Sequence, residues 1–166
     1  MNSRDAILDA IARAGAPRVP RKAPQFDAKA PGDLIERFTT LVSQVAGRCV
    51  QRPVTTPLES LLDTEFPGGR QGVAVLRGRF GVAENGAVYV DADDIDERKL
   101  VVAAEHLVLL VDAASLVPTM HEAVRRMPPN SRCGWFLSGP SKTADIEQAL
   151  VIGAQGARTL LVVLEP

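Results

Sequence analysis

Residues 106–112 read His106-Leu107-Val108-Leu109-Leu110-Val111-Asp112, a continuous apolar run that ends on a carboxylate. Such a run is typical of a β-strand that is covered on both faces of its sheet. Further along, the spacing of apolar residues predicts a helix at 118–127, a strand at 133–137, a helix at 143–152 and a strand at 159–164. Strands and helices that alternate in this way predict an α/β fold with a mostly parallel sheet and right-handed crossovers.

The residues before this run add an antiparallel feature. Short β-rich segments at 81–83 and 87–90 flank Asn85-Gly86, a dipeptide that strongly favours a tight hairpin turn. The turn would hold Glu84 at or beside a strand end. Further upstream the pattern predicts a helix at 33–46 ended by Gly47, a short strand at 49–50, and a short helix at 58–63 that begins at Thr56-Pro57.

The amino-terminal segment has a different character. Residues 3–14 have the apolar spacing of a helix, and residues 15–31 hold four prolines among basic side chains. We therefore predict an N-terminal helix and extended arm over 1–31, followed by one α/β domain over 32–166. The helix has two alternative docking places, its own domain or a neighbouring subunit, and the second would make the protein a homo-oligomer.

Composition excludes several classes of function. The chain has 166 residues, with 19 basic and 20 acidic side chains and a net charge of −1. No basic field is available for a phosphate backbone, so nucleic acid is not expected as a partner. The N-terminus does not resemble a signal peptide, and no apolar run approaches the roughly 20 residues of a membrane span. Cys49 and Cys133 are predicted to be small buried hydrophobic residues, which favours a cytoplasmic protein.

The segment 138–147 is the strongest candidate for a binding site. A loop that leads from a strand into a helix exposes backbone N–H groups and the positive end of the helix dipole, which suits a small anion. The residues that would bind it are Ser138, Gly139, Ser141, Lys142 and Thr143. The alternative is an ordinary capped helix, in which Asp145 and Glu147 complement the dipole. A P-loop is excluded because GxxxxGK[ST] is absent.

Other polar residues are candidates for a catalytic or metal-binding role. Glu84 could act as a nucleophile or general base, although a solvated turn residue is the simpler interpretation. The acidic stretch 91–97 does not fit a calcium loop and is expected to be solvated. Neither His106 nor His121 sits in a metal-ligand spacing, so no metal and no cofactor are predicted.

Two segments resemble a known family. The run Leu137–Glu147 resembles the C-terminal signature of the LUD-domain family of lactate-utilisation proteins (LutC/YkgG), together with Val151-Ile152-Gly153, Gly156 and residues 160–164. Residues 81–86, Gly-Val-Ala-Glu-Asn-Gly, resemble that family's glutamate segment. Gln155 and Ala157 depart from the pattern, because the family usually has His and Pro there.

The resemblance implies a three-layer α/β/α fold of the NagB/RpiA/CoA-transferase-like group. It implies a part in the oxidation of L-lactate to pyruvate beside iron–sulfur partner subunits, since two isolated cysteines cannot build a cluster. Residues 83–86 are also similar to the Ser-Glu-Asn-Gly motif of CoA-transferase β subunits, and that likeness implies Glu84 as a nucleophile. A non-catalytic binding or regulatory subunit is the third hypothesis.

Overall fold

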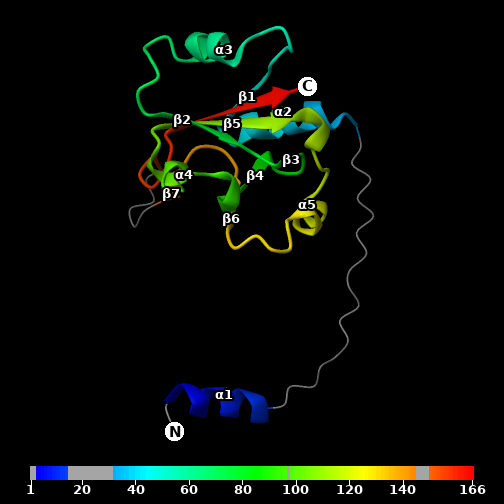
Figure 1. Cartoon of the computed structure of the whole chain (residues 1–166), viewed down its shortest axis with the longest axis vertical. Coiled ribbons are helices and arrows are strands. Elements are labelled where there is room, and N and C mark those ends of the chain that lie inside the picture. Colours follow the sequence, from blue (N-terminus) through cyan, green and yellow to red (C-terminus); the bar gives the residue numbers. More distant parts are fainter. Residues whose placement is uncertain (1–2, 15–31, 97, 145–149) are drawn as a thin grey trace.

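Four parallel strands form the main sheet of the protein, in the order β1–β9–β5–β2 (Figure 1). The computed structural model describes residues 3–14, 32–96, 98–144 and 150–166. The strands of this sheet, called sheet A, are β1 (Arg48–Gln51), β2 (Val73–Arg77), β5 (His106–Asp112) and β9 (Thr159–Glu165). In the two central strands residues 107–111 and 160–164 are buried. The predicted α/β class and the prediction that the strand at 106–112 is covered on both faces are therefore confirmed.

Helices cover both faces of sheet A. On one face, Leu62 of α3 (Leu58–Glu65) packs on residues of β5 and β9, namely Val108, Leu110, Leu161 and Val163. On the other face, Phe38 and Val42 of α2 (Leu34–Gln44) pack on Leu109, Val111, Val162 and Leu164. The short helix α4 (Leu100–Ala103) adds Val101 to this second core. The period-2 alternation of the strands thus divides their apolar residues between two cores.

A second, antiparallel sheet lies against the α2 side. This sheet B contains β3 (Phe80–Val82), β4 (Ala87–Asp91) and β6 (Gly134–Leu137) in the order β3–β4–β6. The predicted hairpin is confirmed, because Val82 pairs with Ala87 across the turn that contains Asn85-Gly86. Helix α5 (Met120–Arg126) covers the outer face, where Ala123 packs with Phe80 and Tyr89. Figure 1 shows α5 beside sheet B, on the side away from α3.

The strand predicted at 133–137 exists, but the expectation that it joins the parallel sheet was wrong. It forms β6 and pairs antiparallel with β4, with Val90 opposite Trp135. The physical reason is the short connection after α5. Pro128-Pro129 ends the helix under sheet B, and the few residues before Gly134 leave the chain beside β4.

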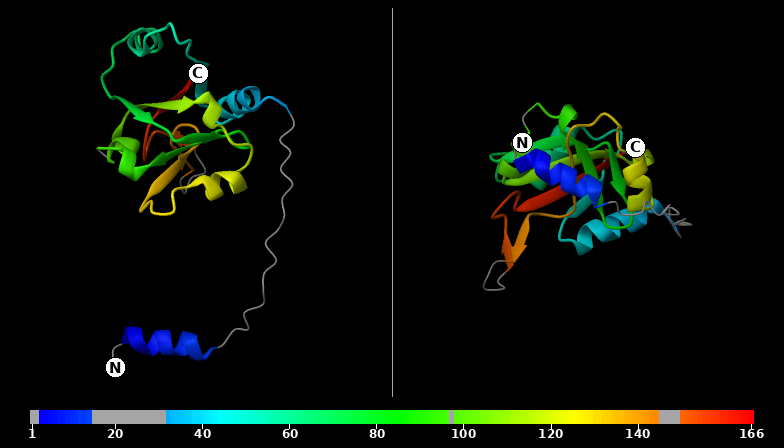
Figure 2. Two further views of the ribbon diagram at one scale, coloured as in Figure 1. Left: turned by 45° about the vertical axis from the view of Figure 1, so that its right-hand side comes forward. Right: turned by 90° about the horizontal axis from the view of Figure 1, so that it is seen from below.

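The prediction of a helix at 143–152 was also wrong. Residues on both sides form strands, β7 (Lys142–Ala144) and β8 (Leu150–Ile152), which pair antiparallel with Thr143 opposite Val151. Thr, Val and Ile at these positions favour strands, because a β-branched side chain packs well against its cross-strand neighbour. Figure 2 shows this hairpin in orange, projecting from the body of the molecule. Asp145 and Glu147, expected to complement a helix dipole, lie outside the described residues.

The helix ends differ by a residue from the predicted caps. At the start of α2, Asp33 accepts a hydrogen bond from the Ile35 N–H at 2.8 Å. At its end Ala46, not Gly47, takes the left-handed conformation with φ 63°, and Gly47 N–H closes the turn on the Val42 carbonyl at 2.9 Å. At α3 the capping position is occupied by Pro57 and not by Thr56.

Helix α1 (Ser3–Arg13) confirms the predicted amino-terminal helix. None of its residues is buried, and Figure 1 draws it apart from the other elements. The proline-rich arm expected at 15–31 lies outside the described residues. In the part of the chain that the structure describes, every helix is too short or too polar to cross a bilayer.

Two expectations about burial were wrong. Cys133 is exposed because it precedes β6, while Cys49 is half-buried beside Thr39, and burial raises the pKa of its thiol. The acidic stretch is not uniformly solvated, because Asp91 is fully buried. Burial alone would raise the pKa of Asp91, but hydrogen bonds from the Asp93 N–H and the Ser131 hydroxyl lower it below its usual value.

Candidate functional site

The loop after β6 is fastened to two neighbouring elements. Ser138 Oγ donates to the Asn85 carbonyl at 2.9 Å, which ties the loop to the β3–β4 turn. Gly139 has φ 73°, and a Cβ at this position would overlap the Val45 carbonyl at the end of α2. Glycine is therefore required here both by the backbone conformation and by the close approach of α2.

Lys142 reaches the same end of α2. Its Nζ donates to the Val45 carbonyl, the C-cap residue of that helix. A positive charge near the carboxyl end of a helix is favourable, because the unpaired carbonyls there carry partial negative charge. The ammonium of the exposed Lys142 is thus partly engaged by the protein's own backbone, although it has three donors in all.

Ser141 is held through its backbone on both sides. Its N–H donates to the Ala157 carbonyl at 2.8 Å, and its carbonyl accepts from the Gly153 N–H at 2.9 Å. Its side chain lies close to Gly156, where an added Cβ would come within 3.2 Å of the Ser141 Cβ. These contacts fix the half-buried Ser141 side chain against the segment that leads into β9.

These residues line one cavity of about 320 Å³, here called the loop cavity. Its lining includes all five residues predicted as ligand-binding, which are Ser138, Gly139, Ser141, Lys142 and Thr143. The walls come from α4, β6 and the segment before β9, with Val101, Val102, Trp135, Gln155 and Ala157 among the contributors. The structure therefore brings the five predicted residues together, although residues 142–144 form a strand and not the helix N-terminus on which the prediction rested.

Glu84 does not belong to the lining of the loop cavity. Its Oε2 accepts a hydrogen bond from the Met120 N–H at 2.7 Å. Met120 is the first residue of α5, so the carboxylate satisfies an N–H group that has no partner within the helix. A negative charge is also favoured at this end of a helix. The Glu84 carboxylate thus links the β3–β4 turn to the first residue of α5.

The remaining polar candidates form no metal centre. Within the described ranges, no group of three or more His, Cys, Asp or Glu side chains is placed to hold a metal ion. His106 Nδ1 lies 2.8 Å from Thr159 Oγ1, where β5 and β9 begin. His121 is an exposed residue of α5.

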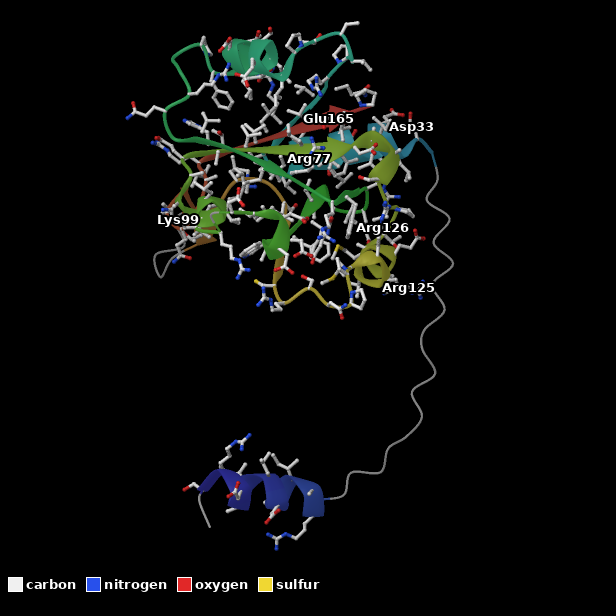
Figure 3. All side chains as sticks on the ribbon, in the orientation of Figure 1. Asp33, Arg77, Lys99, Arg125, Arg126 and Glu165 are labelled. Atoms are coloured by element: carbon white, nitrogen blue, oxygen red, sulfur yellow. The ribbon has the colours of Figure 1, made fainter. Side chains whose placement is uncertain are left out.

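The carboxyl ends of the sheet A strands carry an ion cluster that sequence reasoning missed. Glu165 at the end of β9 accepts from Arg52 at 2.5 Å and from Arg77 at 2.9 Å. Figure 3 labels Arg77 and Glu165 close to each other along the strands of sheet A. Burial alone would raise the pKa of Glu165, but the two arginines outweigh it and hold the pKa below the usual range.

With this geometry established, comparison with known proteins decides the family. The family model described as the LUD domain matches residues 72–164, which is more than half of the chain. The chain belongs to the LUD domain family. All the residues of the loop cavity named above lie within the matched part.

Curated relatives of this LUD protein have informative names. Lactate utilization protein C 1 of Bacillus mycoides (strain KBAB4) is 30% identical over 92 residues, which are 51% of this chain and 39% of the relative. Lactate utilization protein C of Oceanobacillus iheyensis is 30% identical over 84 residues, 45% of this chain and 35% of the relative. The LUD chain therefore matches less than half the length of these relatives.

A solved structure supports the fold. A DUF162 family protein from Deinococcus radiodurans superposes with a TM-score of 0.50 at 14% sequence identity, covering 80% of this chain and 96% of that chain. At this identity the likeness concerns the fold alone.

Several residues that line the loop cavity were missed by sequence reasoning. Val101 and Val102 of α4 and Trp135 of β6 line the cavity from positions distant in sequence from the loop. Gln155 and Ala157 had a signal, since both depart from the pattern of the family that the sequence resembles. The others depend on how α4 and sheet B pack together, which no local pattern records.

Proposed function

We propose that this LUD protein takes part in lactate utilisation, the oxidation of L-lactate to pyruvate, and binds a small anionic metabolite in its loop cavity. The observation that carries the proposal is the gathering of five residues of the family signature around one cavity. The names of the matched relatives supply the pathway.

The residues of the loop would have two roles, positioning the loop and binding the ligand. Ser138 and Gly139 position the loop, because their contacts are with Asn85 and Val45 inside the protein. Ser141 and Thr143 supply hydroxyls to the ligand, and Lys142 supplies positive charge. A single bond to Val45 leaves two of the Lys142 donors for a carboxylate. Lactate has both a carboxylate and a hydroxyl, which matches this set of groups.

The redox chemistry is proposed to reside in iron–sulfur partner subunits. A cluster of the common kinds needs four cysteine ligands, and this chain has two cysteines on separate elements. The LUD protein would then bind the metabolite or its product beside those subunits. Its role as a non-catalytic binding subunit is favoured by Glu84, whose carboxylate caps α5 outside the cavity.

Growth on L-lactate tests the proposed function. A strain without this gene should fail to grow on L-lactate as sole carbon source and should recover with the wild-type gene. The double variant Ser141→Ala/Thr143→Val should not restore growth, because both hydroxyls are removed from the cavity. The matched control Ser60→Ala/Thr55→Val makes the same chemical changes on and before α3 and should restore it. Normal growth of the deletion strain would contradict the proposal.

A further inference from the structure

A second cavity, of about 360 Å³, lies at the amino-terminal edge of sheet A. Its lining includes Arg48, His106 and Thr159, which are the first residues of β1, β5 and β9. Glu65 and Phe66, at the end of α3, also contribute. This edge cavity has no part in the proposed function above.

Strand register shows which face the edge cavity occupies. His106 pairs with Thr159, and Arg48 pairs with Leu161, so β9 lies between the other two strands. Thr159 and Leu161 point to one face of β9, because alternate residues of a strand share a face. Leu161 packs in the core under α3. The edge cavity therefore lies largely on the α3 face, although Leu160, whose side chain points to the opposite face, borders both this cavity and the loop cavity.

The charged groups of the edge cavity favour an anion. Arg48 Nη1 lies 3.0 Å from Glu65 Oε2, and the Glu65 side chain is only 8% exposed. Arg158 Nη1 lies 3.0 Å from Glu105 Oε1. The side chains of both arginines are about two-thirds exposed, at 68% and 66%. Each guanidinium has five N–H donors in a fork, so a contact through one nitrogen leaves donors for a second carboxylate.

Apart from Thr159, whose hydroxyl lies 2.8 Å from His106 Nδ1, the rest of the lining is planar or apolar. The rings of Phe66 and His106 lie with their centroids 5.6 Å apart and their planes at 51°. Leu161 adds an aliphatic surface beside them. Small-molecule sites commonly combine such an apolar lining with a few charged groups, in volumes of about 300–1,000 Å³.

We propose that the edge cavity binds a small monocarboxylate with a planar apolar body. The carboxylate lies on Arg48 and Arg158, and the body lies against Phe66 and Leu161. Each guanidinium already has a carboxylate partner, Glu65 for Arg48 and Glu105 for Arg158, but both keep N–H donors for a further carboxylate, which favours an acid over its neutral analogue. Apart from Leu160, the edge cavity shares no lining residue with the loop cavity, and the proposed ligand has a different shape.

Titration of the full chain with benzoate, followed by amide NMR shifts, tests this proposal. Saturable shifts are expected at Phe66, His106 and Leu161, and equal concentrations of benzamide should leave them unchanged. Arg158→Gln should weaken benzoate binding about tenfold, which is the scale of one lost charge-assisted hydrogen bond. Arg125→Gln, on α5, removes the same charge elsewhere and should bind benzoate like the wild type (Figure 3).

Three results would overturn the proposal: no benzoate-dependent shift at these amides, equal binding of benzamide, or undiminished binding by Arg158→Gln. Should Arg158→Gln fail to fold, Phe66→Leu replaces it as the variant. Loss of the ring should weaken benzoate binding, and unchanged affinity would exclude the proposed contact. The comparison of benzoate with benzamide on the wild type decides the charge requirement without any variant.

Discussion

Gly139 is the residue on which the loop cavity most depends. Its φ of 73° strains any L side chain, and an added Cβ would also overlap the Val45 carbonyl. We predict that Gly139→Ala lowers the free energy of unfolding by roughly 3 kcal/mol, the sum of backbone strain and overlap. Gly69→Ala is the matched control, because Gly69 has φ 103° with nothing within 4 Å of an added Cβ.

Strain without overlap should cost the control about 1 kcal/mol. Urea unfolding followed by circular dichroism measures both variants. Equal losses for the two glycines would mean that the loop does not press against α2.

Glu84 provides a second prediction at the residue scale. Glu84→Ala removes the acceptor of the Met120 N–H and should destabilise the protein by about 1 kcal/mol. Glu84→Gln keeps an oxygen acceptor and should lose less. Differential scanning calorimetry can rank the two. The capping role predicts no acyl adduct, so a hydroxylamine-sensitive adduct on wild-type Glu84 after incubation with an acyl-CoA would instead establish the transferase hypothesis.

At the scale of elements, the β7–β8 hairpin is where sequence patterns misled most. Thr143 and Val151 are cross-strand partners. In a helix, residues eight apart would be about 12 Å apart along the axis, too far for a disulfide. We predict that Thr143→Cys/Val151→Cys, in a Cys133→Ser background, forms a disulfide on mild oxidation.

Thiol titration before and after oxidation gives the result. Thr143→Cys/Gln155→Cys serves as a control, because the strand register pairs Thr143 with Val151 and not with Gln155. A double variant at 143 and 151 that kept both thiols free would contradict the hairpin.

The elements that could be predicted were those with a strong local signal. The apolar run at 106–112 and the Asn85-Gly86 turn each define their structure through nearby residues. From sequence, the β7–β8 hairpin could not be distinguished from a helix, because Lys142-Thr143-Ala144 suits a helix start as well as a strand. Tertiary contacts, such as the hydrogen bond from the Ser141 N–H to the Ala157 carbonyl, favour the strand over the helix.

The candidate site was predictable for a related reason. Ser138 to Thr143 are contiguous, so they share a location whatever structure follows them. The opposite walls from α4 and β6 come together only through long-range packing, which sequence spacing does not encode. Glu84 was predicted separately as a candidate nucleophile or general base, and its contact with Met120 could not be predicted because it depends on the approach of α5 to the β3–β4 turn.

At the scale of the whole molecule, carboxylates of both sheets, Glu165 of sheet A and Asp91 of sheet B, make stability depend on pH. The pKa of Glu165 in the folded protein is below its ordinary value of 4.5, and that of Asp91 is below 3.8. A lowered folded pKa contributes stability that is present above the ordinary pKa and is lost as pH falls through the folded one. We therefore predict that the free energy of unfolding falls steadily below about pH 4.5.

Glu165→Gln should be less stable at neutral pH and should show a flatter decline in acid. Urea midpoints measured from pH 7 to pH 3 give both profiles. Glu36→Gln, on an exposed position of α2, removes one carboxylate as a control. If Glu165→Gln followed the wild-type profile, the Arg52 and Arg77 contacts would have no thermodynamic weight.

The central claim for the molecule is that its loop cavity binds a small anionic metabolite of lactate utilisation. The most direct test is an amide NMR titration of the wild type with L-lactate and with pyruvate, beside the Ser141→Ala/Thr143→Val variant. We predict saturable shifts at residues 139–143 and 155–157 in the wild type and at least tenfold weaker binding in the variant. Unmoved amides at these positions, or equal binding by the variant, would contradict it.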